Sequence, residues 1–261
     1  MDATFSEVIV REPPRTYARC VSTNPFKEKL DLNLAKKQWR DYVSILRENG
    51  IEVIELEPLH SYPDSVFVQD IAVVGCSGKA LLASFGEESR RGEEESLRSF
   101  LEGRGFELRR VEPPGRLEGG DVLVTNEGVV FIGISSRTNE LGIESFERTF
   151  NLRVVRISVS RVFHLLSGVS YLGSRTVALC PSLVDPSFFQ GFKVIYVPDD
   201  ESYASNMLYL GESRVLIPKG FEKTEEKLRK GGFKPLSTDL SEFWKCDGGV
   251  TCLSLPIYYA L

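Results

Sequence analysis

Apolar stretches recur along the chain in one order: a short strand, a turn, a second strand, often a helix, and a further strand. The clearest copies occupy residues 64–85, 118–134, 164–180 and 205–220. Tripeptides such as SGK and NEG separate the first two strands, as polar turn residues do in hairpins. A last copy at 247–259 has no room for its own helix, and we expect the strand and helix patterns at 6–12 and 34–50 to complete it.

The copies begin near residues 64, 118, 164, 205 and 247, so they are spaced by 54, 46, 41 and 42 residues. A β-rich unit of this length cannot bury both of its faces alone, so such units stack or close radially. Five units, with the two chain ends sharing one, predict a closed ring of approximate five-fold symmetry that forms one domain over residues 1–261. An ordinary mixed α/β sheet is the alternative.

A closed ring would bring distant polar residues together, because every unit would start at the same end of its first strand. The residues at those starts are Asp64, Asp70, Glu118, Asp121, His164, Asn206 and Cys252. Asp64 and Asp70 are six positions apart, and an even offset in an extended strand places both on one face. The ring therefore predicts a thiol, an imidazole and several carboxylates around one cavity.

Composition excludes several classes of function. Apolar residues make up 42% and charged residues 26% of the 261 positions, which is typical of a soluble globular protein. The net charge is −5 and no Lys/Arg-rich block occurs, so we do not expect a nucleic-acid partner. No apolar stretch approaches the roughly 20 residues of a membrane helix. The N-terminal residues lack the pattern of a signal peptide, so we expect a cytoplasmic protein.

The five cysteines are irregularly spaced, form no C-x-x-C pair and are accompanied by only two histidines, so we expect no metal site. In a reducing cytosol, free thiols are the default expectation.

Cys252 follows the sequence DGGVT, whose two glycines allow a close backbone approach beside the thiol. It is either a buried strand cysteine or a nucleophile, and an imidazolium from His164 would favour the reactive thiolate. Cys246 is expected to be structural or part of a pocket wall.

The remaining candidates also have two interpretations each. His164 is either a satisfied structural side chain or a proton shuttle. Glu118 in the sequence LEGGD is either an acidic turn residue or part of a cation site. Arg90 and Arg137 are either exposed surface residues or a clamp for a carboxylate, since the guanidinium fork matches that group. Carboxylates near a thiol, together with two arginines, indicate a ligand with a guanidinium at one end and a carboxylate at the other.

The sequence resembles the dimethylarginine dimethylaminohydrolases of the guanidine-modifying, amidinotransferase-type superfamily over nearly its whole length. The segments that carry the resemblance are PDSVFVQD, ESRRGE, EGGDV, SSRTN, FHLLSG, PDDESYASN and DGGVTCLSL. The resemblance implies a five-bladed α/β propeller, the pentein fold, with repeated ββαβ units. It also implies a cysteine hydrolase without a metal or organic cofactor.

The family resemblance assigns roles by position. It implies that Cys252 is the nucleophile, that His164 is the general acid and base, and that Glu118 supports the imidazole. The implied substrate-binding residues are Val21 in a lid loop, Asp64, Gln69, Asp70, Arg90, Arg137 and the backbone carbonyl of Cys246. The partner would be a small guanidino amino acid, and exposed ring edges make a homodimer plausible.

Departures from the family pattern bear on the choice of substrate. Gln69 stands where an acid is expected and Leu166 where a lysine is expected, while Pro256 replaces an arginine of a bacterial form. The segment around Phe85 also lacks an expected arginine. No second aspartate follows His164, which favours a methylated arginine over plain arginine. The alternatives are an arginine deiminase, an amidinotransferase, or a binding protein that has kept the fold without catalysis.

Overall fold

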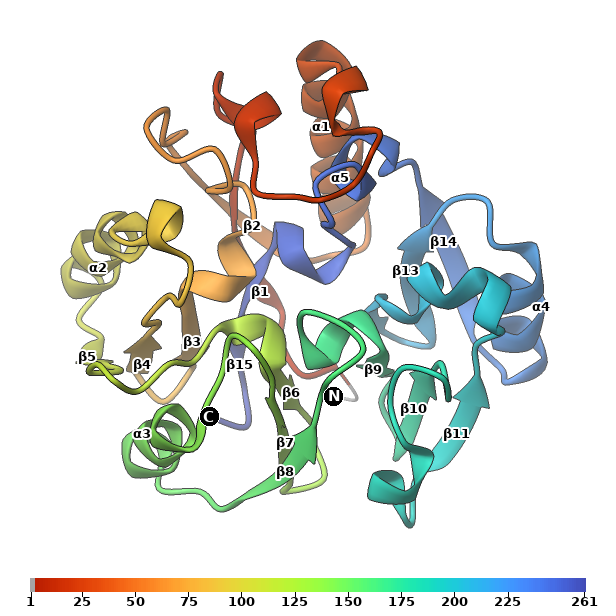
Figure 1. Ribbon diagram of the computed structural model, residues 1–261. Coiled ribbons are helices and arrows are strands. Elements are labelled where there is room, and N and C mark those ends of the chain that lie inside the picture. Colours follow the sequence, from red (N-terminus) through yellow and green to blue (C-terminus); the bar gives the residue numbers. More distant parts are fainter. Residues whose placement is uncertain (1–2) are drawn as a thin grey trace.

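Five three-stranded units surround a central axis, with the longer helices at the periphery (Figure 1). This is a computed structural model in which residues 3–261 are described. Three units form separate sheets, and the other two join edge to edge into one six-stranded sheet. The prediction of a five-unit ring is therefore confirmed.

Each unit, called a blade here, has the same strand pattern. A middle strand pairs antiparallel with an inner strand and parallel with an outer strand. The inner strands are β15 (Leu255–Tyr258), β3 (Ala72–Gly75), β6 (Val122–Val124), β9 (Val169–Tyr171) and β12 (Leu208–Gly211). The middle strands are β1 (Glu7–Arg11), β4 (Lys79–Leu82), β7 (Val130–Ile134), β10 (Thr176–Leu179) and β13 (Arg214–Pro218). The outer strands are β2 (Glu52–Leu56), β5 (Glu107–Arg110), β8 (Val154–Ser158), β11 (Lys193–Tyr196) and β14 (Lys234–Thr238).

Burial follows this order from the axis outward. All residues of the five inner strands are buried, whereas the outer strands include exposed positions. A parallel pair needs a crossover connection, and a helix provides it in four blades. These helices are α1 (Leu32–Glu48), α2 (Glu93–Gly103), α3 (Glu140–Phe150) and α4 (Glu222–Lys230). The fourth blade uses a short 3₁₀ helix at Pro186–Phe189 instead, and α5 (Ser241–Trp244) precedes the last strand.

Local sequence explains where the longest helix begins and what it buries. The Asp31 carboxylate accepts hydrogen bonds from the backbone N–H groups of Asn33 and Leu34, which satisfies two donors at the start of α1. Trp39 and Val43, four residues apart, are both buried on the face that packs against the sheet.

The ring closes through the two ends of the chain. Strand β15 pairs with β1 on one side and with β3 on the other, so it joins the first two blades. Ile9 lies opposite Leu255, and Ile257 lies opposite Val74. The prediction that the ends share a blade is confirmed.

The path into each inner strand differs from the sequence-based expectation. Asp70 lies in a 3₁₀ turn at Val68–Ile71, not in an extended strand with Asp64, so the same-face argument for this pair was wrong. Corresponding 3₁₀ turns precede the other inner strands at Gly119–Asp121, Leu165–Ser167, Asp199–Ser205 and Thr251–Leu253. Backbone turns, more than strand alternation, direct side chains toward the axis.

Two cysteines depart from the expectation of free thiols. Cys20 and Cys246 form a disulfide with a Cα–Cα distance of 6.0 Å and a separation of 226 residues. Both are buried, while Cys76, Cys180 and Cys252 are free. Spacing in the sequence could not identify the pair. Only the closed ring brings the segment of Cys20, after β1, against the segment of Cys246, before β15.

Within residues 3–261, no helix has the length and apolar character needed to cross a membrane.

The disulfide predicts a redox-dependent stability. A cross-link over a long loop lowers the entropy of the unfolded chain, so the paired substitution Cys20→Ser/Cys246→Ser should lower the free energy of unfolding by about 2–4 kcal/mol. Denaturant unfolding with and without dithiothreitol measures this difference. Cys76→Ser is the matched control, since Cys76 is exposed and unpaired. Equal stability of the wild type in both redox conditions would contradict the bond.

Candidate active site

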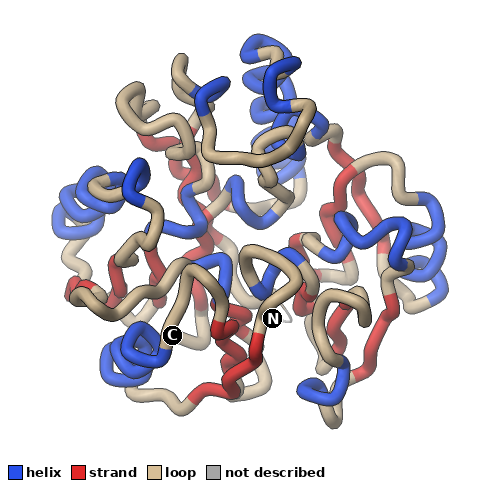
Figure 2. The backbone as a smooth tube through the Cα atoms, viewed as in Figure 1, coloured by secondary structure: helices blue, strands red, loops and turns tan. Residues whose placement is uncertain are grey.

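Loops and short helical turns gather around the centre of the ring (Figure 2). A cavity of about 210 Å³ is lined by residues of these segments. Its walls come from segments far apart in the chain. They are formed by Val21, Ser22, Thr23, Asp64, Phe67, Asp70, Glu87, Arg90, Glu118, Arg137, Phe163, His164, Cys246, Asp247, Gly248 and Cys252. The structure therefore brings nine of the ten predicted site residues to one cavity, and Gln69 is the exception.

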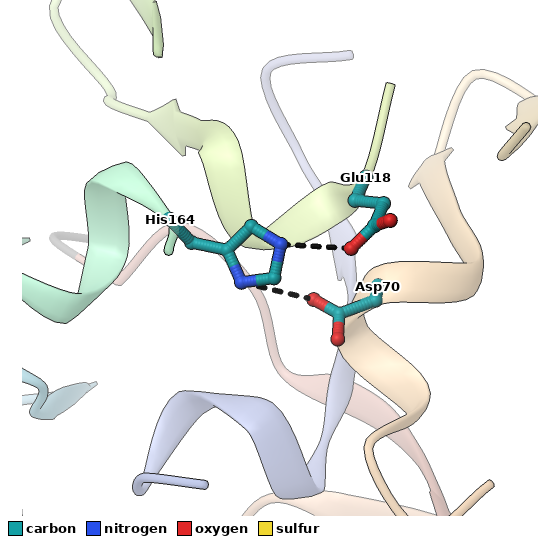
Figure 3. Close-up of side chains that lie close together, drawn as sticks. All are labelled: Asp70, Glu118 and His164. Atoms are coloured by element: carbon teal, nitrogen blue, oxygen red, sulfur yellow. Dashed lines mark hydrogen bonds and ion pairs between the residues drawn. The ribbon is translucent and has the colours of Figure 1, made fainter. Parts of the chain in front are cut away.

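His164 lies between two buried carboxylates (Figure 3). Its Nε2 is 2.8 Å from Oε2 of Glu118, and its Nδ1 is 3.8 Å from Oδ1 of Asp70. Asp121 fixes the backbone that follows His164. Its Oδ1 accepts a hydrogen bond of 2.9 Å from the Leu165 backbone N–H. The imidazole is thus fixed in orientation with one carboxylate on each ring nitrogen.

Glycine is required beside this imidazole. A Cβ placed on Gly120 would lie 2.8 Å from both the His164 ring and Oδ1 of Asp70. Such a contact is too close for any side chain, so the second glycine of LEGGD leaves the room that the His164 ring and Asp70 occupy.

The carboxylates determine the protonation of His164. Burial by itself would lower the pKa of the imidazole, but the charges of Asp70, Glu118 and Asp121 outweigh it and raise the pKa to about 9. Burial opposes ionisation of Asp70 too, yet His164 and Arg90 keep the pKa of that carboxyl below its ordinary value. At pH 7 the site therefore contains an imidazolium beside at least one carboxylate.

Cys252 lies in the 3₁₀ turn Thr251–Leu253 and faces the same cavity. Its Sγ accepts a hydrogen bond of 3.4 Å from the Gly249 N–H. Burial, followed by the negative charge of Asp70, raises the pKa of the thiol to about 12. The sulfur is thus predominantly a neutral thiol before a cation enters.

Asn206 links the 3₁₀ turn that contains Cys252 to the 3₁₀ turn that follows His164. Its Oδ1 accepts from the Thr251 N–H at 2.8 Å, and its Nδ2 donates to the Leu166 carbonyl at 3.0 Å. The sequence placed Asn206 at the axis without giving it a role. A buried amide with both ends bonded to neighbouring turns is a contact that only the structure reveals.

Asp64 and Val21 meet at the edge of the cavity. The Val21 backbone N–H donates to both carboxylate oxygens of Asp64, at 3.2 and 3.1 Å. Burial raises the pKa of Asp64. The Val21 side chain is 41% exposed, so this loop forms an outer wall of the site. The adjacent disulfide ties the loop to Cys246, which also lines the cavity.

The two arginines differ in their surroundings. Arg90 is buried and forms ion pairs with Asp70 at 2.7 Å and with Glu93 at 2.9 Å, so its interpretation as an exposed surface residue was wrong. Arg137 is more open, with its Nη1 3.8 Å from Oε1 of Glu118 and its guanidinium over the ring of Phe163. Arg137 is therefore the freer cation of the two.

Gln69 and Leu166 lie outside the cavity lining. Both line a second, smaller cavity of about 40 Å³ on the inner strands, together with residues such as Tyr258. Gln69 is buried, and its Oε1 has no hydrogen-bond partner among the residues described. The structure does not bring Gln69 to a ligand in the main cavity.

Three side chains of metal-ligating type lie together at the centre. Ligand atoms of Asp70, Glu118 and His164 lie within 4.8 Å of one another. An imidazole between two carboxylates is also an arrangement suited to proton transfer.

A five-bladed α/β ring of this kind is the pentein fold of the guanidine-modifying hydrolases. The family model described as "N,N dimethylarginine dimethylhydrolase, eukaryotic" matches residues 21–259. The chain is 38% identical to the dimethylarginine dimethylaminohydrolase of Streptomyces coelicolor, over 96% of each chain. The protein therefore belongs to the dimethylarginine dimethylaminohydrolase family.

Two further relatives extend this comparison. An uncharacterized protein of Aeropyrum pernix is 46% identical over all of this chain and 98% of its own length. A crystal structure of the Pseudomonas aeruginosa dimethylarginine dimethylaminohydrolase in complex with citrulline superimposes with a TM-score of 0.90 and 32% identity. That match covers 97% of this chain and all of the crystallised chain.

The raised pKa of Cys252 predicts a slow reaction of the free protein with a neutral alkylating reagent. At pH 8 a thiol with pKa 12 is ionised in roughly one molecule in ten thousand, against about one in ten for an ordinary thiol of pKa 9. Because only the thiolate reacts, iodoacetamide labelling of Cys252 should rise about tenfold per pH unit between pH 7 and 10.

Mass spectrometry of the peptide that contains Cys252 separates its labelling from that of the exposed Cys76. Asp70→Asn should speed the labelling at pH 8, because it removes a negative charge that raises the pKa of the thiol. A labelling profile that levels off at or below pH 8 in the free wild type would be inconsistent with a raised pKa.

Proposed function

We propose that the protein hydrolyses Nω-methylated arginine to citrulline and a methylamine through a covalent intermediate on Cys252. The observation that supports this most directly is a pair of buried carboxylate oxygens that accept no hydrogen bond. Oδ1 of Asp70 and Oε1 of Glu118 have no hydrogen-bond partner among residues 3–261. Buried acceptors normally have partners, and the N–H groups of a planar guanidinium are suitable donors.

The reaction begins with a guanidinium carbon that is a poor electrophile because of resonance. Carboxylates orient the cation so that this carbon faces sulfur. The cation also lowers the pKa of Cys252, so the thiol releases its proton to solvent and becomes the reactive thiolate as the substrate binds. The thiolate adds to the carbon and gives a tetrahedral intermediate. His164 then donates its proton to the departing amine and leaves an S-alkylthiouronium.

The second half returns the enzyme to its starting state. Neutral His164 accepts a proton from water, which attacks the same carbon. The C–S bond breaks, the ureido product is released, and the thiol is restored. Glu118 stabilises the imidazolium whenever it forms, through its 2.8 Å contact with Nε2.

The other end of the substrate is assigned by position in the cavity. We assign the α-amino group to Asp64 and the Cys246 carbonyl, with Val21 in the loop above them. Arg137 is the proposed partner of the α-carboxylate, because its guanidinium is the more open one at the cavity. Phe163 and Phe67 supply apolar wall for the methylene chain.

The departures at Gln69 and Leu166 carry less weight for the choice of substrate than the sequence suggested. Both side chains face the second cavity, so neither changes the wall beside the guanidinium.

Arginine deimination and amidino transfer remain the competing reactions. The single-domain organisation, the cytoplasmic location and the homodimer stay predictions.

A substrate panel tests the proposal. Arginine, monomethylarginine and asymmetric dimethylarginine are incubated separately with the protein, and citrulline is quantified. We expect the methylated substrates to give the larger kcat/KM. Citrulline from arginine alone would replace the proposal with a deiminase. Consumption without citrulline when an acceptor amine is present would indicate a transferase.

Two substitutions test the assigned roles. Cys252→Ser should abolish turnover while citrulline binding stays measurable by calorimetry, because serine is a far weaker nucleophile here. His164→Gly should slow substrates with basic leaving amines the most, because they depend on proton donation. Unchanged turnover of the serine variant, or equal losses across leaving groups for the glycine variant, would refute the respective role.

A further inference from the structure

The disulfide joins two parts of the cavity wall at the end that we assign to the α-amino group. Cys20 directly precedes Val21, whose backbone N–H donates to both carboxylate oxygens of Asp64 at 3.2 and 3.1 Å. Its partner, Cys246, lines the cavity and carries the backbone carbonyl that we assign to the same amino group. One covalent bond therefore connects two contacts of a single subsite.

Other contacts hold the Val21 loop, residues 20–26, near the protein surface. The Asn24 side chain donates to the Trp244 carbonyl at 3.0 Å, and the rings of Phe26 and Trp244 lie 5.6 Å apart. Both of these rings are exposed, as is the Val21 side chain, whereas Cys20 is completely buried. Surface contacts of this kind break more readily than a buried covalent bond, so the disulfide is the firm attachment of the loop.

The sulfur of Cys252 is held by contacts that do not involve the disulfide. The Tyr203 hydroxyl donates to the Gly248 carbonyl at 2.7 Å, and the Gly249 N–H donates to Sγ of Cys252 at 3.4 Å. A Cβ on Gly248 would lie 2.3 Å from the ring of Phe67, so the backbone is tightly packed at this point. Loss of the disulfide should therefore change the α-amino end of the cavity and leave the thiol in place.

The disulfide opens by thiol–disulfide exchange with a dithiol. A thiolate of the dithiol attacks one sulfur and forms a mixed disulfide, which its second thiol then resolves. The S–S bond breaks, Cys20 and Cys246 become thiols, and the dithiol becomes a disulfide, so two electrons and two protons pass to the protein. Both cysteines are buried, but Cys246 lines the cavity, which offers a small dithiol an approach.

We propose that the Cys20–Cys246 disulfide is a redox switch on substrate affinity: the bond holds the Val21 loop at the α-amino subsite, and reduction by a dithiol releases the loop. A loop that is already ordered costs less to close over a ligand, so the oxidised protein should bind more tightly. The proposal rests on the proposed function for the identity of the substrate, but not for the movement of the loop.

The kinetic test compares wild-type protein before and after treatment with dithiothreitol, with monomethylarginine as substrate. Reduction should raise KM about three- to tenfold, because the loop must be ordered on binding. The value of kcat should change little, since Cys252 and His164 keep their contacts. Mass spectrometry after alkylation shows the state of both cysteines, and circular dichroism shows that the reduced protein is folded. An unchanged KM in reduced, folded protein would overturn the switch, as would a bond that dithiothreitol cannot open without unfolding.

Two variants show which thiols are responsible. Cys20→Ser/Cys246→Ser keeps the backbone carbonyl at position 246 but cannot form the bond, so its KM should be raised without reductant and should not respond to dithiothreitol. Cys76→Ser should keep the response of the wild type, because Cys76 is exposed and unpaired. A response in the double variant would mean that another thiol is the cause and would overturn the switch. The wild-type comparison decides the question if the double variant does not fold.

Hydrogen exchange tests the movement of the loop without any turnover. In the reduced protein, the peptide that contains Val21 should exchange about tenfold faster, because opening of the loop breaks the bonds to Asp64. Peptides from α3, on another blade, should exchange equally in both states. Equal exchange at Val21 in both states would overturn the switch. Faster exchange in a protein that does not act on methylated arginines would support the switch and refute the proposed function.

Discussion

An imidazolium held between two buried carboxylates is the interaction on which the rest of the site depends. Glu118 and Asp70 are removed from water, and a buried anion is costly unless a cation and hydrogen bonds compensate it. His164 provides that compensation for both, and Arg90 adds a second cation at Asp70. Burial, together with the negative charge of Asp70, keeps the thiol of Cys252 neutral. In the proposed reaction, a planar cation that enters this site shifts the balance in favour of the thiolate.

This arrangement exists only when the ring is closed. A three-stranded blade has too little core to be stable alone, so the blades depend on their neighbours. The thiol is next to the last strand, which joins the first two blades, whereas the histidine precedes the inner strand of the fourth blade. The disulfide between Cys20 and Cys246 fastens the outer loop to the segment that leads to Cys252. Ring closure, the cavity wall and the sulfur of Cys252 are therefore parts of one structural unit.

Membership in the family places the chain among guanidine-modifying enzymes, and the cavity walls are where a substrate would be selected. Asp70 and Glu118 each have one buried carboxylate oxygen that accepts no hydrogen bond. Arg137 lies beside Glu118, whereas Asp64 lies beside the loop of Val21. The departures at positions 69 and 166 lie behind this wall in a separate small cavity. A residue next to a motif in sequence can thus point away from the ligand that the motif contacts.

The sequence pattern predicted the repeated strands and most of the helices, because the alternation and spacing of apolar residues are local properties that the fold preserves. Pattern alone left an ordinary mixed α/β sheet as the alternative to the closed ring and gave each candidate side chain two interpretations. The family resemblance favoured the ring and implied the roles of Cys252, His164, Glu118 and Asp70. Only the tertiary structure decided that Cys20 pairs with Cys246, that Arg90 is buried against Glu93, and that Gln69 faces the second cavity. These outcomes depend on the direction of short 3₁₀ turns and on contacts between distant segments, and neither is encoded in the period of a strand or a helix.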